Sequence, residues 1–150
     1  MKKMATILTA LTIVISSWTR CSALEIDLSI IAEIESSNNP MAISYRGAKY
    51  GRGLCQISEI CLKEYNSYSD SYSDLMTITV EELFIPEVNL RIANWYMNKR
   101  IPSMLKHYGI EDTVKNRLWS YNAGIGRVVN GIMPTETKNY IEKYKKESER

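Results

Sequence analysis

Apolar residues recur along this chain at helical spacing, and prolines and glycines divide them into short segments. In one segment, Leu28, Ile31 and Ala32 stand at positions i, i+3 and i+4, the spacing of one face of an amphipathic helix. No stretch of useful length shows the alternation of a strand, and a short hairpin within residues 43–52 is only weakly indicated. The spacing therefore predicts a single compact all-α domain.

End signals place the individual helices. Thr79 and Glu82 form a capping box before a short helix. Pro86 suits the first position of a helix that Pro102 kinks or ends, and Gly109 stops the segment that follows. The other predicted helices span residues 27–36, 54–65, 113–122 and 136–147.

Residues 1–23 have the pattern of a secretory signal peptide. Two lysines precede an uncharged, mostly apolar run from Met4 to Trp18, and small residues lead up to Ala23. Because this run is short for a membrane span of about 20 residues, we expect cleavage after Ala23, with an uncleaved anchor as the alternative. The prediction is an exported protein, periplasmic or extracellular, with one catalytic domain over residues 24–150.

The charge balance argues against one large class of partners. Without the predicted signal peptide, which contains three basic and no acidic residues, 16 basic and 17 acidic residues remain, and the formal net charge changes from +2 to −1. Nucleic-acid-binding domains are usually basic. We therefore expect no nucleic-acid partner.

Two cysteines, Cys55 and Cys61, lie in the predicted mature domain. Their spacing does not match a zinc motif, and His107 is the only histidine of the chain. Export permits a disulfide, but in one continuous helix the two side chains would point to different faces. We expect free, buried thiols, with a disulfide as the alternative that requires a bend between them.

Glu35 is the acidic residue with the least expected position. It stands seven residues after Leu28, so at about 100° per residue it shares the apolar face, whereas Glu33 points away. An apolar environment raises the pKa of a carboxyl group, and an acid still protonated near neutral pH can donate a proton to a leaving oxygen. The alternative is a solvated helix-end carboxylate bonded to the serine hydroxyls that follow it.

Four motifs occur in order along the chain: IESSNNPMAIS, GLCQIS, SYNAGIGRV and ETKNY. Together they resemble the soluble lytic transglycosylase domain of the lysozyme-like superfamily, which is related to goose-type lysozymes. The resemblance covers about residues 27–145, and four motifs in order make it specific. It implies a compact helical domain with a substrate cleft, in a lysozyme-like α+β superfamily with little or no strand.

The resemblance also assigns expected roles to individual residues. It implies that Glu35 is the catalytic acid/base, and that five further residues bind the saccharide: Ser44, Gln56, Tyr121, Asn122 and Tyr140. In the family, the position of Ser44 lies near the catalytic carboxylate, and that of Tyr121 lies over the reacting sugar and its N-acetyl group. Without the resemblance, Tyr121 and Tyr140 would be interpreted as core aromatic residues.

Two features depart from the family pattern. Cys55 replaces the usual methionine; both residues are soft and often buried, although a thiol could be oxidised after export. The loop before it is longer than usual, which leaves Arg46, Lys49 and Arg52 open to two interpretations. They could face the acidic peptide stems or the lactyl group of a glycan, or they could face only water.

The number of carboxylates bears on the mechanism. Most glycosidases use two, and some recruit the substrate as the second participant. Since no motif supplies a partner for Glu35, the expected activity is that of a peptidoglycan lytic transglycosylase. Such an enzyme cleaves the β-1,4 bond between N-acetylmuramic acid and N-acetylglucosamine and leaves 1,6-anhydro ends, here for local cell-wall remodelling.

Two other functions stay open on the sequence. One is a lysozyme-type muramidase that hydrolyses the same bond, and the other is a wall-binding assembly factor of a secretion, conjugation or phage apparatus. The expected partners are peptidoglycan strands and, for the second role, such an apparatus. We expect a monomer without a metal, an organic cofactor or a stable membrane span after cleavage.

Overall fold

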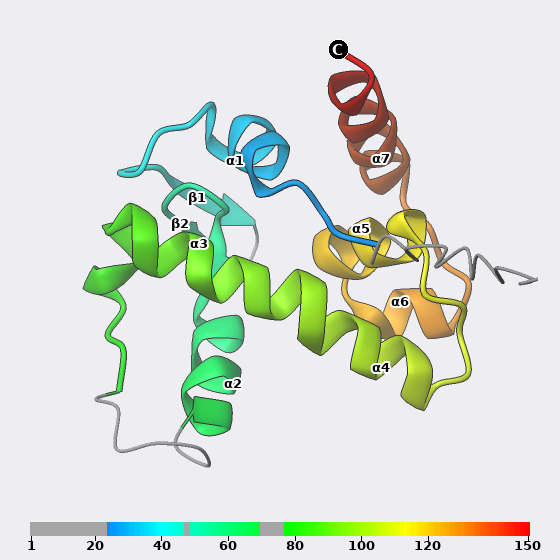
Figure 1. Ribbon diagram of the computed structural model, residues 1–150, viewed down its shortest axis with the longest axis horizontal. Helices are drawn as coiled ribbons and strands as arrows, with labels where there is room; N and C mark the ends of the chain where they lie inside the picture. Colours follow the sequence, from blue (N-terminus) through cyan, green and yellow to red (C-terminus); the bar gives the residue numbers. More distant parts are fainter. Residues whose placement is uncertain (1–23, 47–48, 70–76) are drawn as a thin grey trace, which may run out of the picture.

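The computed structural model describes residues 24–46, 49–69 and 77–150. Within these residues the fold is mostly helical with one small antiparallel sheet, which confirms the predicted fold class (Figure 1). The predicted signal peptide, residues 1–23, lies outside the described residues. None of the helices that the structure describes is both long and apolar enough to cross a membrane.

Seven α-helices are present in the described residues, and three of the predicted helices agree with α1, α5 and α7 to within one residue at each end. The helices are α1 (Leu28–Ser36), α2 (Glu59–Ser69), α3 (Pro86–Trp95), α4 (Ile101–His107), α5 (Val114–Ala123), α6 (Ile125–Val129) and α7 (Thr135–Ser148). A 3-10 turn, η1 (Glu81–Phe84), precedes α3, and a π-helical segment, η2 (Tyr96–Arg100), joins α3 to α4. As a result, α3, η2 and α4 run as one rod across the molecule (Figure 1).

The weakly indicated hairpin is present and is extended by a third strand. The strands are β1 (Ile43–Arg46), β2 (Lys49–Arg52) and β3 (Ile57–Ser58), in the order β1-β2-β3. Ser44 pairs with Gly51 in the first ladder, and Arg52 pairs with Ile57 in the second. The sheet therefore holds the segment after α1 beside the segment that leads into α2.

One predicted helix boundary is wrong. The helix expected over residues 54–65 begins only at Glu59, because residues 54–58 form a turn and the short strand β3. Gln56 has a left-handed backbone with φ of 52°, which a helix cannot contain. Asn89 of α3 binds the Cys55 amide through its side chain (2.8 Å), so a tertiary contact overrides the local helical preference.

Pro102 does not end the helical rod, contrary to one of the two expectations for it. It stands in the first turn of α4, directly after the π-helical segment. A proline removes one backbone donor from a helix, and π-helical turns are a recognised local adjustment within α-helices. The rod therefore continues to His107, and Gly109 with φ of 66° follows it as the predicted stop.

The interior contains two apolar clusters that share aromatic residues. The larger cluster joins α1, α3, α5 and α7, and the smaller one consists of Ile101, Met104, Leu105 and Val128. Tyr96, Trp119 and Tyr121 pack against both clusters. These rings are held at the junction of the clusters, which fixes their position.

The segment before α1 is attached to the body by polar contacts. Arg117 of α5 donates to the Leu24 carbonyl and forms a two-pronged ion pair with Asp112 (2.6 and 2.7 Å). The Asp27 amide donates to the Tyr144 hydroxyl of α7 (2.9 Å), and Ile26 between them is buried. These contacts fix the start of α1 against α5 and α7.

Candidate active site

Helix α1 carries Glu35 into the interior. Its first turn is capped by the Asp27 carboxylate, which accepts a hydrogen bond from the Ser29 amide (2.9 Å). Ile31 and Ala32 are fully buried, and Glu35, one turn further on, is half-buried on the same face. The predicted placement of Glu35 on the apolar face is therefore observed.

The SSNN sequence ends α1 abruptly, directly after Glu35. Ser37 and Asn38 both have left-handed backbones (φ 52° and 58°), and their amides bond back to the Glu33 and Ala32 carbonyls (3.0 and 3.2 Å). This satisfies carbonyls that the helix end would otherwise leave open. Glu33 is exposed and accepts a hydrogen bond from the Asn38 side chain (2.6 Å). Its carboxylate therefore stabilises the turn that ends α1.

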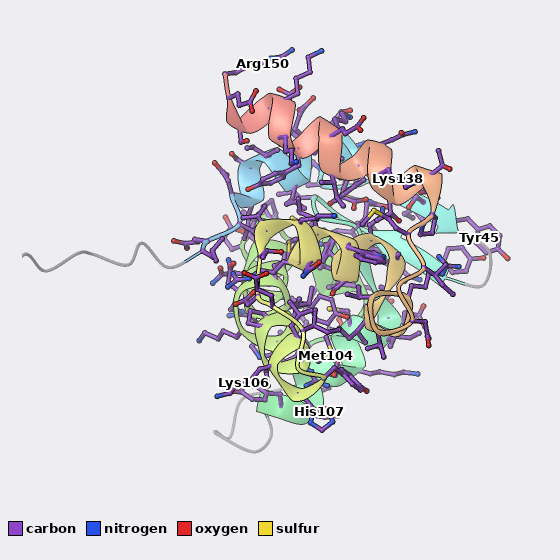
Figure 2. All side chains as sticks on the ribbon, turned by 90° about the vertical axis from the view of Figure 1, so that its right-hand side faces the viewer. Tyr45, Met104, Lys106, His107, Lys138 and Arg150 are labelled. Atoms are coloured by element: carbon purple, nitrogen blue, oxygen red, sulfur yellow. The ribbon has the colours of Figure 1, made fainter. Side chains whose placement is uncertain are left out.

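A cleft of about 580 Å³ opens beside Glu35. Five of the six predicted site residues line it: Glu35, Ser44, Gln56, Tyr121 and Asn122. Its walls come from α1, the sheet, α2, the π-helical segment, α5, α6 and the first turn of α7. The sheet and the start of α7 lie on one side of the molecule, as the labelled Tyr45 and Lys138 show (Figure 2).

The sixth residue, Tyr140, is placed differently. It is buried in the larger apolar cluster and is not among the residues that line the cleft. It lies close enough to Tyr121 to contribute to the raised pKa of that phenol. Its placement corresponds to the core aromatic residue considered from the sequence, and a direct role in binding saccharide stays a prediction.

The Gln56 side chain lines the cleft but is bound to the protein. Its amide nitrogen donates to the Ala42 and Gly53 carbonyls (3.1 and 2.8 Å), and its amide oxygen accepts from the Ser44 hydroxyl (2.5 Å). Both of its N–H donors are therefore occupied. These bonds hold the start of β1 against the turn that contains Gln56, and so they fix the shape of the cleft at this point.

The peptide groups of Cys55 connect both walls of the cleft. The Cys55 amide donates to Asn89 Oδ1 (2.8 Å), and its carbonyl accepts from the Tyr121 hydroxyl (2.5 Å). Asn89 is fully buried, and its Nδ2 also donates to the Arg52 and Leu83 carbonyls (2.9 and 2.8 Å). Sequence reasoning missed Asn89, because nothing local marks an asparagine within a helix as a buried anchor.

Tyr121 presents its ring to the cleft and its hydroxyl to the interior. The residue is half-buried overall, and burial raises the pKa of its phenol well above the ordinary value, with further contributions from Cys55 and Glu35. The phenol therefore stays protonated and continues to donate to the Cys55 carbonyl. Its ring face is the part available for a ligand, whereas a contact between its hydroxyl and a ligand would require this bond to rearrange.

Two buried polar groups at the cleft have no partner within the part of the chain that the structure describes. They are the Ser120 hydroxyl and the Asn122 side-chain nitrogen, although Asn122 Oδ1 accepts from Thr137 (2.7 Å). Both residues line the cleft. Buried donors are almost always bonded, so a bound ligand or water is expected to satisfy them.

Sequence reasoning did not single out three further cleft residues: Tyr96, Arg127 and Glu136. The Tyr96 ring packs near that of Tyr121, with 6.0 Å between centroids. Arg127 lies within the third motif and Glu136 begins the fourth, so the motifs themselves contained a signal. The resemblance to the family assigned no role to Arg127 or Glu136.

Of the three cationic residues in the long loop, Arg52 is bound outside the cleft. Arg52 pairs with Glu59 (3.0 Å), and its guanidinium lies over the Tyr50 ring (5.5 Å to the centroid). It does not line the cleft. The side chains of Arg46 and Lys49 lie outside the described part of the structure.

Both cysteines are free and buried, as expected. Burial raises the pKa of each thiol to about 12, with a smaller contribution from Glu35 for Cys55 and from Glu64 for Cys61. The reactive form of cysteine is the thiolate. Both side chains are therefore protonated at neutral pH.

A second hollow, of about 650 Å³, lies elsewhere on the surface. It is lined by the segment before α1, by α1 itself and by α3, and it contains none of the predicted site residues. Two motif residues, Asn38 and Leu54, line it, and its two carboxyl groups, Glu25 and Asp27, lie outside the motifs. The cleft beside Glu35, which contains five of the six predicted residues, is therefore the candidate active site.

Comparison with known protein families identifies the family of the chain. The model of the Transglycosylase SLT domain family matches residues 21–144. The chain belongs to the SLT transglycosylase family. No curated protein and no solved structure matches this SLT domain. Membership makes it a peptidoglycan-processing protein of the lytic transglycosylase type, whose substrate lies outside the cytoplasm.

Replacement of Tyr121 tests whether its hydroxyl or its ring serves the SLT domain. We expect Tyr121→Phe to lower the free energy of unfolding by about 1–3 kcal/mol, because the buried Cys55 carbonyl loses its donor. Glycan cleavage should fall only a few-fold, since the ring remains. Tyr121→Ala should reduce cleavage much further. Urea unfolding and turnover of purified variants measure both effects, and an unaltered stability of Tyr121→Phe would contradict the role of the bond.

Proposed function

We propose that this protein is a peptidoglycan lytic transglycosylase that leaves 1,6-anhydro-N-acetylmuramic acid ends. The observation that carries the proposal is the position of Glu35, half-buried on the apolar face of α1 and lining a cleft with the Tyr121 ring. Apolar surroundings favour the protonated form of a carboxyl group. The family match over most of the chain supports the same substrate.

The proposed reaction uses Glu35 twice. As an acid, Glu35 gives its proton to the glycosidic oxygen, and the bond from the anomeric carbon to N-acetylglucosamine breaks. The N-acetyl carbonyl oxygen of the muramic acid bonds to the anomeric carbon in its place. As a base, the Glu35 carboxylate takes the proton of the C6 hydroxyl, whose oxygen displaces the N-acetyl oxygen and closes the 1,6-anhydro ring. No water is consumed, and Glu35 ends protonated.

A second candidate, hydrolysis by a muramidase of the same fold, is favoured by one observation. Glu136 places another carboxyl group in the lining of the cleft. Glycosidases with two carboxyl groups use the second one as a nucleophile or to activate water. Glu136→Gln should stop cleavage if the enzyme is such a hydrolase, and should leave cleavage active if it is a transglycosylase.

The product end distinguishes the two reactions directly. We expect digestion of purified peptidoglycan in heavy-oxygen water to release muropeptides with 1,6-anhydro ends that contain no label, because the acceptor is the substrate's own hydroxyl. Mass spectrometry of the products measures this. Reducing muramic ends that contain the heavy isotope would instead identify a hydrolase.

We also propose that the protein is exported and cleaved after Ala23. Leu24 accepts a hydrogen bond from Arg117 and Ile26 is buried, so a chain that begins at Leu24 would keep both contacts. N-terminal sequencing of protein from its native compartment should begin at Leu24. Retention of Met1 would favour an anchored form.

We further propose that the protein opens the wall locally for a secretion, conjugation or phage apparatus.

A further inference from the structure

Arg127 is a cation at the cleft that the reaction does not use. It belongs to α6, its side chain is exposed, and it lines the cleft that contains Glu35. Among the residues that the structure describes, no salt bridge or hydrogen bond involves its guanidinium group. This distinguishes it from Arg52, Arg100, Arg117 and Arg150, which are all paired with acids.

The backbone of Arg127 is held by two hydrogen bonds, whereas its guanidinium group binds no other described residue. Its amide donates to the Gly124 carbonyl (3.1 Å), and its carbonyl accepts from the Ile132 amide (2.9 Å). The next residue, Val128, is buried in the smaller apolar cluster. The guanidinium group is therefore presented from a fixed point on the cleft wall, with five donors that suit a carboxylate.

The same wall contains other signs of a polar ligand. Ser120 and Asn122, which precede Arg127 by seven and five residues, contribute two buried cleft groups that have no partner among the described residues. The cleft also contains Glu136, and Glu35 becomes a carboxylate once it has given up its proton. A carboxylate in the cleft repels an anionic ligand. Among the described residues that line the cleft, Arg127 is the one cation that can offset this repulsion.

We propose that Arg127 is a specificity-determining residue that binds a carboxylate attached to muramic acid. This inference rests on the proposed function, because it assumes a peptidoglycan strand in the cleft. Such a strand carries its carboxylates on the peptide stem, or on the lactyl group where the stem has been removed. Arg127 selects these strands over neutral amino sugars of the same length.

The test compares wild-type protein with Arg127→Gln, Arg127→Lys and a matched control, Lys106→Gln. Lys106 is an exposed cation on α4, at the end of the molecule away from α7 (Figure 2). Calorimetry gives the dissociation constants for three oligosaccharides of equal length: stem-bearing glycan, glycan stripped to its lactyl carboxylates, and neutral N-acetylglucosamine oligomers. Turnover of the stem-bearing glycan gives kcat and KM.

We expect Arg127→Gln to weaken binding of stem-bearing glycan about three- to tenfold at low salt, to raise KM by the same factor and to leave kcat unchanged. Arg127→Lys should recover part of the loss, and high salt should reduce it. Neutral oligomers should bind equally well to all variants. An equal loss with the stripped glycan identifies the lactyl carboxylate as the ligand, and a loss confined to stem-bearing glycan identifies the stem.

Two results would overturn the inference: unchanged binding of both anionic glycans by Arg127→Gln, or an equal loss with neutral oligomers. Either leaves the proposed function intact, provided wild-type protein still produces 1,6-anhydro ends. Conversely, wild-type protein that binds these glycans without producing such ends contradicts the proposed function. The binding comparison then still decides the role of Arg127.

Discussion

Replacement of Glu35 by glutamine should slow glycan cleavage by about 10²–10⁴-fold. The amide has nearly the same shape as the acid, so the fold should be retained, but it can neither donate nor retrieve the proton of the proposed reaction. Glu35 lines the cleft from the last turn of α1, with Ile31 and Ala32 buried behind it. Release of soluble muropeptides from purified peptidoglycan measures the rate.

Glu33→Gln is the matched control for this experiment. Glu33 lies on the same helix, is exposed and accepts a hydrogen bond from Asn38, which an amide oxygen can also accept. Its turnover and its urea midpoint should both match those of the wild-type protein. Turnover of Glu35→Gln close to the wild-type value would remove Glu35 from the mechanism. A lowered urea midpoint of Glu35→Gln would indicate that the substitution also destabilises the fold.

The largest expected loss of stability comes from Gly53→Ala, about 3–5 kcal/mol. Gly53 has φ of 73°, and an added Cβ would lie 2.2 Å from the Leu83 carbonyl oxygen and 2.3 Å from Asn89 Nδ2. Neither group can move freely, because Asn89 donates to Leu83 and is fully buried. The substitution must therefore break the contacts that hold the Cys55 amide, and cleavage should be lost together with stability.

Gly131→Ala separates the two causes of that loss. Gly131 also has a left-handed backbone (φ 66°), but an added Cβ would meet nothing within 4 Å. It should cost only the backbone term, about 1–2 kcal/mol. Urea denaturation of both variants measures the difference. Equal losses would show that the close approach at Gly53 contributes nothing.

Local signals were sufficient to predict most helices. Thr113 caps α5 by accepting from the Asn116 amide, and Pro86 opens α3, because a cap or a proline acts on the residues next to it. The Glu82 carboxylate bonds to the Thr79 amide (2.7 Å), which is half of the expected capping box. The failure over residues 54–58 has a non-local cause, since the Asn89 side chain that holds Cys55 comes from 34 residues further along the chain.

The sequence predicted which residues form the candidate site, but not the hydrogen bonds that these residues make. The motifs placed Gln56 and Tyr121 in the cleft, where they lie. They gave no indication that the Gln56 donors and the Tyr121 hydroxyl are directed to backbone carbonyls. Such partners are set by the distance between segments in the folded chain, and a motif records only which residues occur.

The Tyr121–Cys55 bond also has a consequence for the order of events during folding. It joins residues 66 positions apart, and the Asp27–Tyr144 bond joins residues 117 positions apart. Contacts between such distant residues require closure of long loops and slow the folding of a chain. The cleft is incomplete until α7 has docked on α1, because Glu136 of its lining belongs to α7. If the proposed function is correct, a chain in which α7 has not yet docked should not cleave peptidoglycan.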